Sequence, residues 1–134
     1  SSVHGLQDFT GADVKIALGD GKAMALGKVG SRILKNAGLD EKKMNVVARG
    51  ATVKQLVQWI EGNNADASIV WRADAVQSGK VEILNIPEEV NVIEMIPVCT
   101  MKEPQSRELA TAYINFLLSE GKKVFQTYGF KIVE

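Results

Sequence analysis

The sequence contains very little of two residue types on which many enzymes and metal sites depend. Cys99 is the single cysteine and His4 the single histidine among 134 residues. One cysteine cannot close an internal disulfide or form a cysteine-based zinc site. With one histidine, a histidine-dependent catalytic triad is not expected.

Excess charge and long apolar runs are also missing. Sixteen Lys and Arg residues balance sixteen Asp and Glu residues, so the formal net charge is zero. Strong nonspecific binding to nucleic acid requires a basic excess, and we therefore expect no nucleic-acid partner. No stretch approaches the roughly 20 apolar residues of a membrane-spanning helix. The first residues, SSVHGLQDF, carry neither the charged start nor the apolar run of a signal peptide.

The sequence does contain an alternation of strand-like and helix-like segments. Apolar residues recur at helical spacing over residues 26–37, which end at Gly38, and over residues 53–60, for which Thr52 is the natural N-cap. Four short apolar segments are interpreted as strands: Val14–Leu18, Asn45–Ala48, Ala67–Trp71 and Val81–Ile86. This order predicts an α/β fold with a parallel-centred sheet flanked by helices.

The chain changes character after Pro87. Val92–Met101 is expected to be extended, and two helices are expected to follow it, Gln105–Leu118 and Ser119–Tyr128, with Ser119 as the N-cap of the second. The fold is thus predicted to end in a C-terminal helical pair. Its aromatic residues are expected to form core or a docking face: Tyr113, Phe116, Phe125, Tyr128 and Phe130.

The cluster Gly19-Asp20-Gly21-Lys22, between the first strand and the first helix, suggests a phosphate site but fails two tests of spacing. A Walker A loop needs four residues before its Gly-Lys pair and Ser or Thr after the lysine, whereas Ala23 follows here. A dinucleotide turn needs a third glycine where Met24 stands. The alternative is that the turn only connects a strand to a helix.

Helix N-termini bind anions through free N–H groups and the positive end of the helix dipole. Two of them are expected here beyond the carboxyl ends of strands, one near Leu26 and Gly27 and one near Thr52 and Val53. Ligands of open α/β sheets bind at that edge.

Trp71 and Arg72 end a predicted strand at the same edge. Trp71 is expected to be a half-buried packing residue, and Arg72 to be solvated or paired with a carboxylate. Asp74 is expected to be a helix N-cap or the partner of Arg72.

Four stretches carry a family likeness: IALGDGKAMALGKVGSRILKNAGL, GATVKQLVQWIEGNNADASIVWRADA, VEILNIPEEVNVIEMIPVCTM and ATAYINFLLSEGKKVFQTYGF. The last is the most specific, with a helix, Leu-Ser-x-Glu-Gly, and a short helix that ends in Tyr-Gly-Phe. Together they resemble the second half of the periplasmic molybdate- and tungstate-binding proteins of ABC importers. The resemblance covers almost the whole chain from about Leu6.

The resemblance implies two α/β lobes joined by a hinge, with a tetrahedral oxyanion in the cleft, held by backbone N–H groups and hydroxyls. It implies that Leu26 and Val53 supply N–H groups and that Trp71 stands where the family has a ligand-binding tyrosine. With the neighbouring helix-start residues, the candidate ligand-binding residues are Leu26, Gly27, Thr52, Val53 and Trp71. No catalytic residue, metal ligand or cofactor other than the oxyanion is expected.

Three positions depart from the family pattern. Trp71 replaces tyrosine, and an indole N–H can donate but reaches differently. Ala25 stands where many members have proline, and Val70 where archaeal relatives that surround the metal with six oxygens have glutamate. A different anion or an organic acid is therefore an alternative ligand.

The resemblance also predicts how the chain is divided. Residues 1–91 correspond to the second lobe, without its first strand, and residues 92–134 to a hinge-crossing strand and helices that pack on the first lobe. The chain is therefore expected to be a fragment or a truncated form. The apolar face of Leu109, Tyr113, Phe116 and Phe125 would then be covered by that missing lobe or by a homodimer.

The function expected from these inferences is that of an extracytoplasmic solute-binding protein, periplasmic or anchored on the outer face of a prokaryotic cell, which delivers molybdate or tungstate to the membrane permease of an ABC importer. It is not expected to be an enzyme. The alternatives are a ligand-sensing regulatory domain of the same fold, a transferase that uses Lys22 and Arg72 on a phosphate, and a chain that binds nothing.

Overall fold

The computed structural model describes residues 3–133, and the chain divides into two compact units. Unit 1 is Ser1–Val92 and unit 2 is Ile93–Glu134. Each is described by itself.

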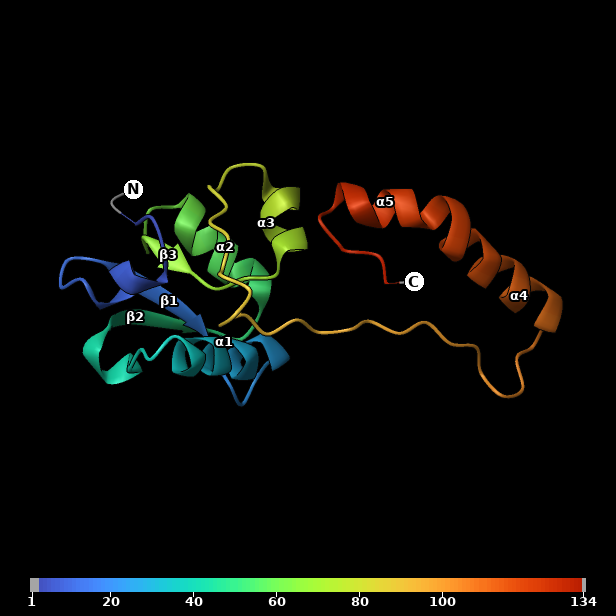
Figure 1. Cartoon of the computed structure of the whole chain (residues 1–134). Coiled ribbons are helices and arrows are strands. Elements are labelled where there is room, and N and C mark those ends of the chain that lie inside the picture. Colours follow the sequence, from blue (N-terminus) through green and yellow to red (C-terminus); the bar gives the residue numbers. More distant parts are fainter. Residues whose placement is uncertain (1–2, 134) are drawn as a thin grey trace. The chain divides into compact units, whose positions relative to one another are not determined.

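A three-stranded parallel sheet forms the centre of unit 1 (Figure 1). Its strands are β1 (Lys15–Gly19), β2 (Asn45–Gly50) and β3 (Ala67–Ser68), in the order β2-β1-β3. β1 pairs with β2 up to Gly19 opposite Gly50, with one register shift between Ile16 and Ala17. A central strand with parallel neighbours on both sides is buried on both faces, which explains why Ile16, Ala17 and Leu18 are all apolar and buried.

Three helices cover this sheet: α1 (Ala25–Asn36), α2 (Val53–Glu61) and α3 (Arg72–Ser78). α1 lies on one face, and α2 lies with α3 on the other (Figure 1), as right-handed crossovers to opposite sides of β1 require. α1 ends as predicted, since Gly38 has φ of 70° and its N–H donates to the Lys35 carbonyl. Two short 3-10 helices, η1 (Leu6–Thr10) and η2 (Glu41–Lys43), complete the unit.

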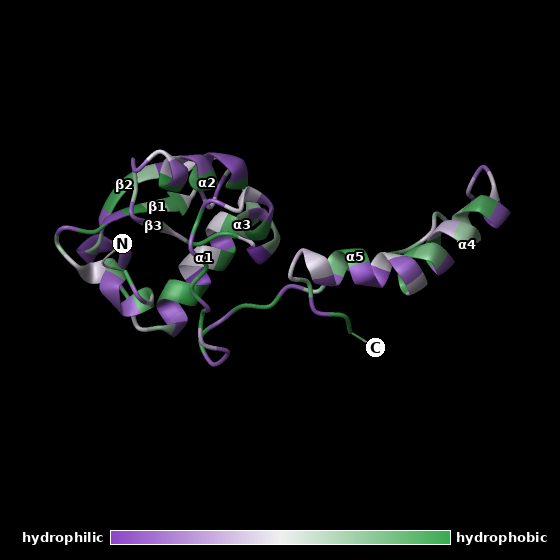
Figure 2. Cartoon of the chain, turned by 90° about the horizontal axis from the view of Figure 1, so that it is seen from above, coloured by the Kyte–Doolittle hydropathy of each residue, from purple (hydrophilic) through white to green (hydrophobic). Residues whose placement is uncertain are grey.

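The core of unit 1 is the apolar layer between the helices and the sheet. Ile16 from β1, Leu34 from α1 and Leu56 from α2 are its largest fully buried side chains. Burying each such side chain contributes roughly 1.5–3 kcal/mol to folding. The ribbon of the strands is accordingly coloured mostly as hydrophobic (Figure 2). The predicted α/β fold class, with a parallel sheet flanked by helices, is confirmed.

Two of the predicted strands are wrong in part or in whole. Only Ala67 and Ser68 of the predicted Ala67–Trp71 strand pair with β1, and Val81–Ile86 forms no strand. A strand needs a neighbour for its backbone N–H and C=O groups. Apolar content alone predicted these segments, and it carries no information about whether such a neighbour exists.

Unit 2 begins with an extended segment and ends in helices. α4 (Arg107–Phe116) continues through the π-helical turn η3 (Leu117–Gly121) into α5 (Lys122–Thr127). The prediction that Ser119 is an N-cap is wrong, because its hydroxyl donates back to the carbonyl of Asn115 at 2.8 Å within a continuous helical run. Ser106 caps α4 instead, accepting the Leu109 N–H at 3.3 Å.

Unit 2 has almost no core of its own. Gly121 is its only buried residue among those that the structure describes, whereas Leu109, Tyr113 and Phe116 are all more than half exposed. Hydrophobic and hydrophilic residues alternate along α4 and α5 (Figure 2). Phe125 and Phe130 make an edge-to-face contact at 5.6 Å between ring centroids, but both rings stay partly accessible. No helix in residues 3–133 is both long and apolar enough to cross a lipid bilayer.

Candidate functional site

The carboxyl edge of the sheet brings the predicted site residues into one region of unit 1. β1 and β2 end side by side, with Gly19 paired to Gly50. The Asp20 N–H donates to the Gly50 carbonyl at 2.8 Å, so the loops that lead into α1 and α2 start from a shared hydrogen bond. β3 runs parallel on the other side of β1 and leads to Trp71, the N-cap residue of α3. Two helix starts and Trp71 therefore follow neighbouring strands.

In the turn before α1, the N–H groups of Lys22, Ala23 and Met24 are used within the protein. The Asp20 carboxylate accepts the Lys22 N–H at 2.7 Å, and the Asp20 carbonyl accepts the Met24 N–H at 3.0 Å. The anion position of this turn is thus filled by a side chain of the chain itself. A phosphate loop would need those same N–H groups free, which explains why the Gly-Asp-Gly-Lys cluster is a connection and not a phosphate cradle.

The first turn of α1 supplies the donors instead. The N–H groups of Ala25 and Leu26 precede any possible helical acceptor and have no partner in the described chain. Leu26 is 2% exposed as a whole residue, and its side chain belongs to the core of unit 1. The Gly27 N–H is already used, since it donates to the Met24 carbonyl at 3.1 Å.

Gly27 allows the loop to approach the helix. A Cβ at this position would lie 2.5 Å from both the Asp20 carbonyl oxygen and the Gly21 nitrogen. Gly19 packs nearby, since a Cβ added to it would lie 3.0 Å from the Gly27 backbone. The role that the structure supports for Gly27 is therefore close backbone packing.

The start of α2 is fixed by a capping box. The predicted N-cap Thr52 accepts the Gln55 N–H at 3.3 Å through its hydroxyl, which confirms that part of the prediction. The Gln55 side-chain oxygen accepts the Ala51 N–H at 2.9 Å and the Thr52 N–H at 3.3 Å. The N–H groups of Val53 and Lys54 remain without an acceptor among the described residues.

Gln55 was missed as a component of this edge. The signal that could have found it is the spacing Thr-x-x-Gln at a helix start, which is typical of a capping box. The role of Asp20 was also missed, although an aspartate two residues before an N–H donor often closes such a turn.

Trp71 is half-buried and packs against the core of unit 1, as predicted. Its carbonyl accepts the Asp74 N–H at 3.1 Å, and its indole N–H has no acceptor within residues 3–133. The predictions for Asp74 are wrong, because Trp71 is the N-cap of α3 and Arg72 donates to the Asn85 side chain at 2.9 Å. Arg72 thus pairs with an amide and not with a carboxylate.

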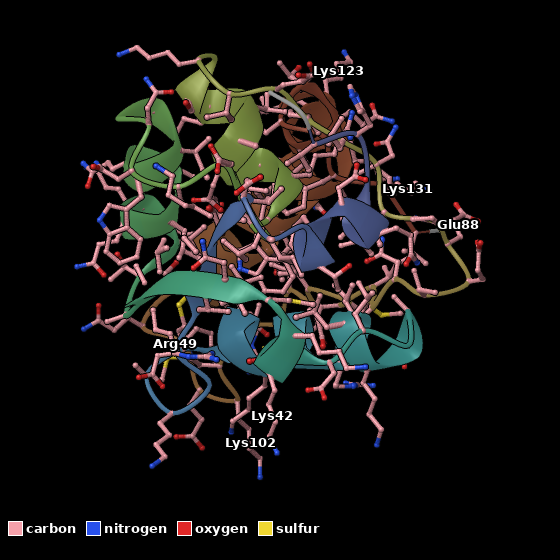
Figure 3. All side chains as sticks on the ribbon, turned by 90° about the vertical axis from the view of Figure 1, so that its left-hand side faces the viewer. Lys42, Arg49, Glu88, Lys102, Lys123 and Lys131 are labelled. Carbon is pink, nitrogen blue, oxygen red and sulfur yellow. The ribbon has the colours of Figure 1, made fainter. Side chains whose placement is uncertain are left out.

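A surface hollow lies away from these donors. Its lining includes Ser31, Lys35, Glu41 and Arg49 but none of the predicted site residues. Arg49, labelled in Figure 3, extends from β2 and makes an ion pair of 2.6 Å with Glu41. This hydrogen-bonded guanidinium holds the pKa of Glu41 below its usual value, with help from the Ser31 hydroxyl at 2.8 Å. These residues brace η2 against α1 and β2.

The chemistry available at the sheet edge is hydrogen-bond donation. Four backbone N–H groups on two helix starts and one indole N–H have no acceptor among the described residues, and the positive ends of the helix dipoles favour an anion. Within residues 3–133 no group of three or more His, Cys, Asp or Glu side chains is arranged to hold a metal ion.

Known proteins are similar to this chain in sequence and in structure. Residues 1–131 match the family model described as bacterial extracellular solute-binding protein. A Bacillus subtilis protein named "Putative ABC transporter substrate-binding lipoprotein YvgL" is 31% identical over 87% of this chain and 45% of its own length. A Haemophilus influenzae "Putative binding protein" is 28% identical over 97% of this chain and 54% of its own length.

A solved structure is also similar, and its title is "substrate binding domain of putative molybdenum ABC transporter from Clostridium difficile". It has a TM-score of 0.82 and 31% sequence identity, over 99% of this chain and 59% of that one. The chain thus spans about half the length of the relatives that it matches. Because the family model covers nearly every residue, this chain belongs to the bacterial extracellular solute-binding protein family.

Proposed function

We propose that this chain is the second lobe of an extracytoplasmic solute-binding protein that delivers a tetrahedral oxyanion, molybdate or tungstate, to the permease of an ABC importer. The observation that carries the proposal is the pair of helix starts at one sheet edge, with N–H groups of Leu26 and Val53 that have no acceptor in the described chain. A fully ionised oxyanion offers only acceptors, so such donors suit it.

The ligand assignment has further support from one relative, the solved substrate-binding domain of a protein titled as a molybdenum transporter component. In this proposal the two lobes close around the dehydrated anion. Selectivity against sulfate then comes from cavity size, because sulfate has the same charge and shape on a smaller scale. The protein performs no chemistry on the ligand.

Trp71 favours a second candidate, a binding protein for another anion or an organic acid. Its indole supplies a donor, but it is larger than the tyrosine side chain of the related binding proteins. It is half-buried and follows β3 at the carboxyl edge of the sheet, the edge from which α1 and α2 also start. A larger side chain at this edge changes the space that a ligand can occupy.

Calorimetric titration of this chain, together with the first lobe that the proposal assigns to it, tests both candidates. Tight one-to-one binding of molybdate and tungstate, with little heat from sulfate, is the expected result. Heat from none of the three, followed by binding of an organic acid in a screen, would replace the first candidate with the second. If neither the three inorganic anions nor the organic acids give heat, both candidate functions are excluded.

The first lobe is also the proposed cover for the apolar side chains of unit 2. Leu109 is 71% and Tyr113 62% exposed, and a patch of this kind promotes association. The 134-residue chain alone is expected to form dimers as its concentration rises, whereas the chain together with its first lobe stays monomeric. Sedimentation analysis measures both, and a strictly monomeric chain at high concentration would count against a homodimer through these helices.

A further inference from the structure

We infer that Gln55 determines the charge preference of the α2 donors by capping the helix start without adding a negative charge. The inference rests on the proposed function, because it concerns the same oxyanion site. Gln55 is not one of the ligand donors. It is a positioning residue that acts through the backbone of residues 51–53.

Three hydrogen bonds hold this turn. The Gln55 side-chain oxygen accepts from Ala51 at 2.9 Å and from Thr52 at 3.3 Å, while the Thr52 hydroxyl accepts the Gln55 N–H at 3.3 Å. Thr52 has the extended backbone of an N-cap, with φ of −135° and ψ of 151°. Three N–H groups are thereby used within the protein, and the next two, of Val53 and Lys54, are the ones left for a ligand.

The same turn could be capped more strongly by a glutamate. The capping box accepts Glu or Gln at this position, and a carboxylate at a helix N-terminus interacts favourably with the positive end of the helix dipole. Since Gln55 is exposed, a charge there would carry little desolvation cost. Considered for stability alone, glutamate is the better residue.

A glutamate would, however, oppose an anionic ligand. Its carboxylate would stand within one helical turn of the Val53 N–H and would satisfy the positive end of the dipole that a ligand otherwise meets. A neutral amide leaves that end for the ligand. Stability thus favours glutamate at position 55, whereas anion binding favours glutamine. The protein has glutamine.

The experiment compares Gln55→Glu with Gln58→Glu in this chain, together with the first lobe that the proposed function assigns to it. Gln58 is exposed on the same helix, one turn farther from its N-terminus. It therefore carries the same charge change at a greater distance. Sodium molybdate is titrated into each variant by calorimetry at pH 7.5, at low and at high salt, and each melting temperature is recorded.

Gln55→Glu is expected to change stability and molybdate affinity in opposite directions. Gln55→Glu keeps or raises the melting temperature but weakens molybdate binding more than about tenfold at low salt, and added salt recovers part of the loss. Gln58→Glu changes affinity by less than about threefold. A residue with a purely structural role would move affinity and stability in the same direction.

Each remaining outcome overturns the inference. Binding by Gln55→Glu within twofold of the parent protein shows that charge at position 55 does not matter. A lower melting temperature for Gln55→Glu contradicts the capping role. If the parent protein binds molybdate and only the variants behave unexpectedly, the proposed function survives, whereas no binding by the parent protein removes both.

Discussion

At the scale of single residues, Gly27 has a requirement that the surrounding backbone sets directly. It sits where α1 begins, against the loop of residues 20–21, and no side-chain rearrangement can make room for a Cβ there. The two N–H groups at the start of α1 without an acceptor in residues 3–133, those of Ala25 and Leu26, come two residues and one residue before Gly27. The shape of this loop and the position of those donors are therefore coupled.

Gly27→Ala is expected to lower the free energy of unfolding by about 1–3 kcal/mol or more, because it overpacks a backbone contact. Gly30→Ala is the matched control on the same helix, since its Cβ would meet only the Ile69 side chain, at 3.9 Å. Replacing glycine inside a helix by alanine should raise stability there by up to about 1 kcal/mol. Urea denaturation measures both, and equal effects would contradict the close-approach role of Gly27.

Glu41 gives a pH-dependent prediction at the same scale. Its pKa is lower in the folded protein than its usual 4.5, mainly through the hydrogen bond from Arg49. Stability from this pairing is therefore present above the unfolded pKa and is lost as pH falls through the folded one. Glu41→Gln should cost less than about 1 kcal/mol at pH 7, because Arg49 is 46% exposed.

The cost of Glu41→Gln should shrink between pH 7 and pH 3, because the parent protein loses the charge of Glu41 as the pH falls through its folded pKa. Denaturation at both pH values measures this difference. Glu89→Gln serves as the control, since Glu89 is exposed and makes no ion pair among the described residues. A cost for Glu41→Gln that is unchanged between pH 7 and pH 3 would show that the ion pair is not its source.

At the scale of helices and strands, the start of α2 depends on the Thr52 hydroxyl. Thr52→Ala removes the acceptor of the Gln55 N–H and should cost about 1 kcal/mol. Thr52→Ser keeps the hydroxyl and should stay within a few tenths of a kcal/mol of the parent protein. Thermal melting distinguishes them, and equal losses in both variants would mean that the threonine methyl, not the cap, matters.

The helices were more predictable than the strands for a physical reason. The period of Leu26, Val29 and Ile33 and the stop at Gly38 are local properties, so they located α1 within a residue or two. Ala67–Trp71 and Val81–Ile86 have the right composition for strands, but pairing depends on partners far away in the sequence. Only the first two residues of the former find one.

The candidate site shows the same limit. Strand ends and helix caps placed Leu26, Thr52 and Val53 at one sheet edge, and the structure agrees with that placement. The sequence could not show which N–H groups were already used, such as those that Asp20 and Gln55 accept. Whether a side-chain oxygen reaches a given N–H group depends on the folded geometry, which the sequence pattern does not give.

At the scale of the whole chain, the two units differ in how they can be stable. Unit 1 has a continuous core around Ile16, Leu34 and Leu56, whereas unit 2 buries only Gly121 among the described residues. Most of a helix's stability in a protein comes from packing an amphipathic face and not from intrinsic propensity, and the helices of unit 2 have little such packing. Unit 2 therefore needs a partner surface that a separate peptide would not have.

A polypeptide of residues 3–92 is expected to unfold cooperatively, and a peptide of residues 93–133 to show little helicity in dilute solution. Circular dichroism with thermal melting measures both. Equal mass concentrations of the two provide the comparison. Strong helicity of the 93–133 peptide at micromolar concentration, independent of dilution, would contradict the claim that it lacks a sufficient core.

The donors at the sheet edge, and the three strands that hold them, come from one uninterrupted stretch of the chain, from Lys15 to Trp71. During synthesis this stretch leaves the ribosome well before unit 2 does. Its sheet can therefore form while α4 and α5 are still being translated, and the donor geometry does not have to wait for them. Because the stretch is contiguous, it can also be exchanged as one segment between related proteins.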